Sequence, residues 1–120
     1  KGATALFYFY KGGKVQKLVH KLKYKGQEEL GLLFGKWLGA ELVESNFFNS
    51  IDVVIPVPIH PRKLKKRGYN QVALFAQYLA ISLNAKFEDS VLLKSTFTQT
   101  QVFQSREERF QSVSNSFVAK

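Results

Sequence analysis

The 120-residue chain contains no cysteine and no methionine. Without cysteine, disulfides and thiolate zinc sites are excluded; the compartment is left open, and we take the reducing cytoplasm as the default. No apolar run approaches the roughly 20 residues that a membrane-spanning helix needs. Because the initiator methionine and any terminating pattern are also missing, we interpret the chain as a fragment of a longer protein.

Acidic residues are absent from two long stretches, residues 1–25 and 53–87. The net charge of +9 is therefore segregated along the chain. Positive charge concentrated in parts of the chain is typical of proteins that bind nucleic acid or phosphorylated metabolites. The alternative interpretation is that the charge serves solubility alone.

Short apolar runs predict strands over residues 6–10, 51–57 and 91–93. The second run has almost no polar alternation, which is typical of a strand buried on both faces of a parallel sheet. Strands that alternate with helices indicate an α/β fold.

Apolar spacing and helix-end signals predict four helices. They cover residues 15–22, 27–44 and 69–83, and a short helix from a capping box at Ser105 to about Gln111. In the second helix, Gly31, Gly35 and Gly39 recur every four residues. Since each glycine costs a helix about 0.5–1 kcal/mol relative to alanine, we expect another element to pack very close to this stripe.

The stretch from Ile51 to Gln71 is the most informative in the chain. Its β-branched run ends at Pro56 and Pro58, opens into five basic residues and passes Gly68 into the next predicted helix. The C-terminal end of a strand beside a helix N-terminus is where open α/β sheets bind anions. We therefore predict a phosphate or polyanion site here, with a solvated basic loop as the alternative.

Four groups of residues match one family pattern: Lys23–Gly26; Pro56–Arg62 followed by Arg67–Gln71; Leu93 and Lys94 with Thr98 and Gln101; and Arg106, Arg109 and Phe117. They resemble the ComF/GntX family, whose catalytic domain is similar to type I phosphoribosyltransferases. The resemblance covers nearly the whole chain. One departure is Lys94, which stands where the family frequently has arginine.

The resemblance implies the N-terminal part of a phosphoribosyltransferase-like open sheet domain with flanking helices. Residues 1–120 would form a single partial domain: an N-terminal strand and helices (1–50), a core strand, helix and strand (51–93), and a flexible loop with a short helix (94–120). Two family features are missing from the sequence, the cysteine zinc ribbon and the Thr-Thr-Gly loop that grips phosphoribosyl pyrophosphate (PRPP). We therefore expect this chain alone to be inactive in transfer.

The resemblance also implies an anion site for the pyrophosphate side of PRPP. Its expected residues are Pro58, Arg62, Lys63, Arg67, Gly68, Asn70, Gln71, Thr98, Gln101, Arg106 and Arg109. Arg62 and its neighbours would stabilise the departing pyrophosphate, and magnesium would accompany PRPP in a full-length homologue. The chain itself offers no metal site or cofactor, and no catalytic residue is assigned. Asn70 as a helix cap and Gly68 as a turn glycine are compatible alternatives.

The second hypothesis is a non-catalytic component of DNA uptake in natural competence, the process that the family name implies. Its partners would be single-stranded DNA or competence proteins, contacted by Lys14, Lys17, Lys21, Lys23, Tyr24 and Lys25. A solvated helix face is the alternative for these lysines. We also expect association into homo-oligomers through an exposed sheet edge.

Overall fold

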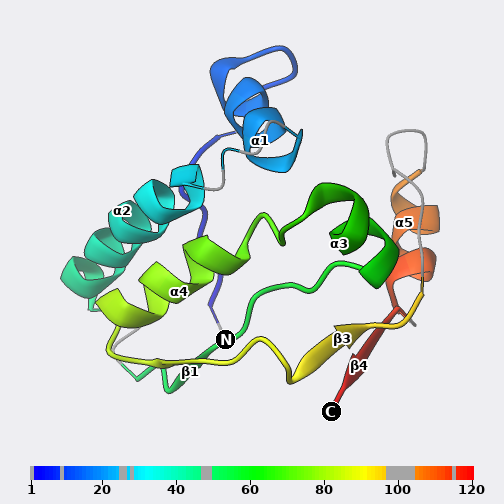
Figure 1. Ribbon diagram of the computed structural model, residues 1–120. Helices are drawn as coiled ribbons and strands as arrows, with labels where there is room; N and C mark the ends of the chain where they lie inside the picture. The colour runs from blue at the N-terminus through cyan, green and yellow to red at the C-terminus, as the bar shows by residue number, and fades with distance from the viewer. Residues whose placement is uncertain are drawn as a thin grey trace.

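The computed structural model describes residues 2–8, 10–24, 27, 29–46, 50–96, 105–114 and 116–120. Over these residues the chain is mixed α/β, which confirms the predicted class (Figure 1). The elements follow in the order α1 (Lys14–Tyr24), α2 (Glu29–Ser45), β1 (Val53–Val54), α3 (Pro61–Arg67), α4 (Ala73–Ser82), β2 (Lys86–Phe87), β3 (Leu92–Lys94), α5 (Arg106–Ser114) and β4 (Phe117–Ala119).

The strands form two separate pairs. β1 lies parallel to β2, with Val53 opposite Lys86, and α4 packs on both strands. The prediction of a long, fully buried strand over residues 51–57 is wrong, because β1 has two residues and Val53 and Ile55 are 43% and 42% exposed. Cover by α4 accounts for one face only, so the apolar run is half-buried.

The other two predicted strands also differ from the structure. β3 lies where residues 91–93 predict it, but its partner is the antiparallel β4, and Leu93 is 45% exposed instead of buried. The described part of residues 6–10 contains no strand. Its Phe7 ring packs edge-on against Phe34 and Trp37 of α2, at centroid distances of 5.2 and 5.4 Å. The aromatic run is therefore held by a helix and not by a strand edge.

Another element packs close to the glycine stripe of α2, as predicted. This element is α4, and the two helices lie side by side in Figure 1. A Cβ added at Gly35 would lie 2.5 Å from the carbonyl oxygen of Phe75, and one at Gly39 would lie 2.4 Å from Ser82 Cβ. Such distances leave no room for a side chain, so the glycines set how closely the helices approach. Part of the apolar surface of α2 is open, since Leu33 and Trp37 are 54% and 50% exposed.

The short helices α1 and α5 follow their sequence signals. In α1 Leu22 is buried, and the lysines at 14, 17 and 21 are exposed. The capping box before α5 is present: the Ser105 N–H donates to Glu108 Oε2 at 2.7 Å, and the Glu108 N–H donates to Ser105 Oγ at 3.2 Å. α5 continues beyond the predicted end to Ser114. Within the part of the chain that the structure describes, no helix combines the length and apolar character needed to cross a membrane.

Candidate anion-binding site

The basic stretch after β1 is a helix, α3, and not the loop predicted for it. His60 caps its start, because the Arg62 N–H donates to His60 Nδ1 at 3.2 Å, and Pro61 occupies the first turn, where a missing N–H costs nothing. Gly68 ends the helix at a φ of +88°, a conformation that costs other residues about 1–2 kcal/mol. Seven residues are too few for a periodicity, but proline near the start and glycine just past the end form a signal that could have located it.

Asn70 connects the chain before α3 with the turn after it, through hydrogen bonds to Val57 and Val72. Its Oδ1 accepts a hydrogen bond from the Val72 N–H at 3.2 Å within the turn before α4. The N-cap of α4 is Val72, with no side-chain cap hydrogen bond, so the prediction of Asn70 as the helix cap is wrong. Its Nδ2 also donates to the carbonyl oxygen of Val57 at 3.1 Å. In the same turn, Gln71 Oε1 accepts a hydrogen bond from Arg67 Nη1. The turn therefore fixes both the position of α3 relative to β1 and the direction of the Arg67 guanidinium.

Lys23, Lys63, Arg67 and Lys94 are half-buried, whereas every other described lysine and arginine is exposed. We call these four residues the cationic cluster. They come from α1, α3 and β3, segments far apart in the sequence. The Lys94 ammonium also lies 5.4 Å from the centroid of the Phe117 ring on β4, a favourable cation–π distance. The fold therefore partly shields these charges from water.

Lys63 interacts with the other three charges. Burial lowers the pKa of Lys63 below its ordinary value, and repulsion from Lys94, Arg67 and Lys23, in that order, lowers it further. Like charges raise the electrostatic energy of the folded chain, and desolvation disfavours each charged form. An anion bound among them would offset both costs. The cluster therefore has the electrostatics of an anion-binding site.

The structure brings together only part of the predicted anion site. Lys63 and Arg67 belong to the cluster, and Asn70, Gln71 and Gly68 shape the turn beside it. Pro58 lies half-buried in the extended segment that leads to α3. Arg62, Arg106 and Arg109 are exposed and do not appear among the groups that shift the Lys63 pKa. Thr98 and Gln101 lie outside the described residues.

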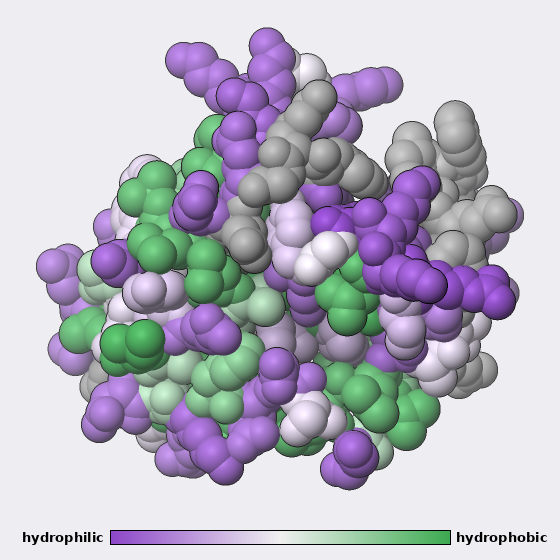
Figure 2. All heavy atoms as spheres, in the orientation of Figure 1, coloured by the Kyte–Doolittle hydropathy of each residue, from purple (hydrophilic) through white to green (hydrophobic). Residues whose placement is uncertain are grey.

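The lysines predicted for nucleic-acid binding divide into two sets. Lys14, Lys17 and Lys21 lie on the exposed face of α1, whereas Lys23 is half-buried and belongs to the cluster. Lys25 and the side chain of Tyr24 lie outside what is described. In Figure 2, hydrophilic side chains gather over α1 and around α3, and hydrophobic ones gather mostly over α2 and α4.

Sequence reasoning left Lys94 and Tyr69 out of the predicted site. Lys94 had one signal, its place where the ComF/GntX pattern frequently has arginine. Tyr69 had none beyond its place within the motif, because its partner lies 47 residues earlier in the chain.

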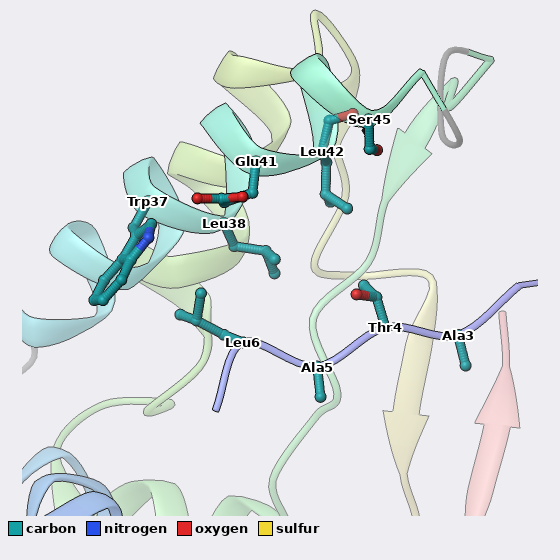
Figure 3. Close-up of a pocket in the computed structure, with 9 residues that line it drawn as sticks. All are labelled: Ala3, Thr4, Ala5, Leu6, Trp37, Leu38, Glu41, Leu42 and Ser45. Atoms are coloured by element: carbon teal, nitrogen blue, oxygen red, sulfur yellow. Dashed lines mark hydrogen bonds between the residues drawn. The ribbon is translucent and has the colours of Figure 1, made fainter. Parts of the chain in front are cut away.

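A cavity of about 600 Å³ lies apart from the cluster, between residues 3–6 and α2 (Figure 3). Leu6, Leu38 and Leu42 border the space between the N-terminal segment and the helix, and Glu41 is its charged residue. It offers no cation for a phosphate group. Among the described residues, no group of three histidine, cysteine or acidic side chains could hold a metal ion.

The sequence is similar to curated proteins named DNA utilization protein YhgH. Over 103 residues it is 27% identical to the protein of Shigella flexneri and 27% identical to that of Salmonella typhi. The aligned region covers 83% of this chain and 45% of each relative, so the chain spans less than half the length of these relatives. No family model and no solved structure matches it. The similarity supports the expected relation to proteins connected with the use of DNA.

Proposed function

We propose that the chain is part of a ComF/GntX-type protein with a phosphoribosyltransferase-like domain, and that its cationic cluster binds the diphosphate of PRPP. The observation that carries this proposal is the assembly of four half-buried cations from three chain segments. Two of them follow β1 on the chain, on the side where α/β proteins bind ligands. The similarity to DNA utilization proteins is compatible with this assignment but does not name a ligand.

The cluster suits a diphosphate better than a single negative charge. Arg67 offers a planar guanidinium that pairs with two phosphate oxygens, and the three lysines contribute point charges. In the full-length protein, PRPP would lose pyrophosphate from its anomeric carbon through an oxocarbenium-like state. The cluster would stabilise the negative charge that develops on the departing group. Magnesium would be held by the diphosphate and ribose hydroxyl oxygens of PRPP.

The proposal is tested by titrating the chain with inorganic pyrophosphate and with PRPP plus magnesium in a calorimeter. Lys63→Gln should weaken binding about tenfold or more, because it removes a charge-assisted hydrogen bond in a partly desolvated place. Lys66→Gln is the matched control, since Lys66 lies on the same helix but is exposed. The proposal is wrong if the wild-type chain shows no saturable binding, or if both variants weaken it equally.

The second candidate is binding of single-stranded DNA by the exposed lysine row of α1. Two observations favour it: Lys14, Lys17 and Lys21 share one open face, and the curated relatives carry the name of DNA utilization proteins. Replacing all three by glutamine should weaken oligonucleotide binding and reduce the slope of log affinity against log salt by about two to three. Pyrophosphate binding should not change, because none of the three belongs to the cluster. An unchanged salt slope would exclude this surface.

A further inference from the structure

Tyr69 connects two parts of the molecule that the chain keeps far apart. It lies in the turn between α3 and α4, and its hydroxyl donates a hydrogen bond to the carbonyl oxygen of Leu22 in the last turn of α1. The last four carbonyls of a helix have no partner within the helix. The tyrosine therefore supplies a hydrogen-bond donor to a carbonyl that has no partner within α1, and it does so from the turn that follows α3.

The residue after Leu22 is Lys23, the cluster member that α1 supplies. Lys63 and Lys23 repel each other, so electrostatics alone would move the end of α1 away from the cluster. Two described features oppose this repulsion: the burial of Leu22, and the hydrogen bond that its carbonyl accepts from Tyr69. The bond holds the backbone next to Lys23 to the same turn in which Asn70 and Gln71 position α3.

We propose that Tyr69 is a positioning residue of the anion site, which holds Lys23 beside Lys63 by binding the end of α1. The site is then assembled by one turn, which positions α3 through Asn70 and α1 through Tyr69. This inference rests on the proposed diphosphate binding. It adds that the site requires the Tyr69 hydroxyl, which the sequence alone does not reveal.

A double-mutant cycle on the full chain, with inorganic pyrophosphate as the probe, tests the tether. Tyr69→Phe keeps the ring and removes the hydroxyl, and we expect about fivefold weaker binding. In the Lys23→Gln background the same change should have no further effect, because the residue through which Tyr69 acts is gone. In the Lys94→Gln background it should keep its full effect. Circular dichroism would establish that each variant is folded.

A structural role alone would give a different pattern. If Tyr69→Phe weakens binding equally in all three backgrounds, it acts through the general stability of the fold, and the inference is overturned. The same conclusion follows if wild-type protein binds pyrophosphate and Tyr69→Phe binds equally well. Either result leaves the proposed function intact.

A ligand-free measurement decides the inference even if pyrophosphate does not bind. The Lys63 pKa, followed by NMR, should rise in Tyr69→Phe as Lys23 moves away, and Lys23→Gln should raise it to a similar extent. An unchanged Lys63 pKa in Tyr69→Phe, with a raised one in Lys23→Gln, would show that the tether does not position Lys23.

Discussion

Residues lie unusually close together both in the α2–α4 pair and in the cationic cluster, but the effect on stability is opposite. Between the helices, three glycines remove side chains so that two backbones can touch, and the contact stabilises the fold. In the cluster, four side chains of the same charge are brought together and partly desolvated, which raises the energy of the fold. The first arrangement is explained by stability. The second fits the proposed anion ligand, because proteins keep unfavourable local arrangements where function requires them.

Gly35→Ala should produce the largest effect, on the helix side of this comparison. The new Cβ would lie 2.5 Å from a backbone oxygen of α4, which cannot rotate away as a side chain does. We expect a loss of about 2–3 kcal/mol in the free energy of unfolding, measured by urea denaturation. Gly31→Ala is the graded control, because its Cβ would meet its nearest atom at 3.2 Å and should cost less. Equal losses in both variants would contradict the close-packing account.

Asn70→Ala should cost about 1–2 kcal/mol, because it removes the acceptor for Val72 and the donor to Val57 together. Asn70→Asp separates the two roles, since a carboxylate still accepts from Val72 but cannot donate to Val57. We expect the aspartate variant to recover part of the loss in urea denaturation. Full recovery would mean that the Val57 bond contributes nothing to the position of α3.

Lys63→Gln should move stability and binding in opposite directions. Without ligand, it removes repulsion within the cluster and should raise the free energy of unfolding by about 0.5 kcal/mol. Pyrophosphate binding should weaken in the same variant. Denaturation with and without pyrophosphate measures both effects on one sample. If the variant is less stable than the wild type without ligand, the cluster stabilises the fold, as the α2–α4 contact does.

The smallest expected effect is on the pH dependence. The folded pKa of Lys63 lies below its ordinary value of 10.5, so between these two values the unfolded chain binds more protons than the folded chain. Stability attributable to Lys63 should therefore rise with pH across this window. Affinity for pyrophosphate should fall over the same window, because the neutral amine does not attract an anion. In Lys63→Arg both trends should disappear, since arginine stays protonated.

Features that depend on a few neighbouring residues were predictable from the sequence. The capping box at Ser105 and the turn glycine Gly68 follow local rules, and the structure confirms both. The glycine stripe of α2 also predicted its own close contact, because no other reason explains its cost to a helix. The sequence did not identify α4 as the partner.

Features that depend on which distant segments meet were not predictable. β1 pairs with Lys86 and Phe87, two residues that show no strand pattern in the sequence. α4 packs on both strands of this pair, a contact that the sequence does not reveal. The aromatic run near the N-terminus looked like a strand, but its Phe7 ring packs on α2. Membership of Lys23 and Lys94 in one cluster required the folded arrangement of α1 and β3. The sequence thus pointed to the segment that supplies Lys63 and Arg67, while the grouping of these residues with Lys23 and Lys94 appears only in the folded chain.

The contact of Phe7 with Trp37 gives the molecule an optical property. Trp37 is the chain's single tryptophan, it is half exposed, and it lines the cavity of Figure 3. The emission wavelength of an indole depends on how much water surrounds it. Movement of the N-terminal segment off α2, or entry of an apolar molecule beside it, would therefore change the fluorescence of an unlabelled sample. The fluorescence of Trp37 therefore reports on a cavity whose lining includes none of the cluster residues.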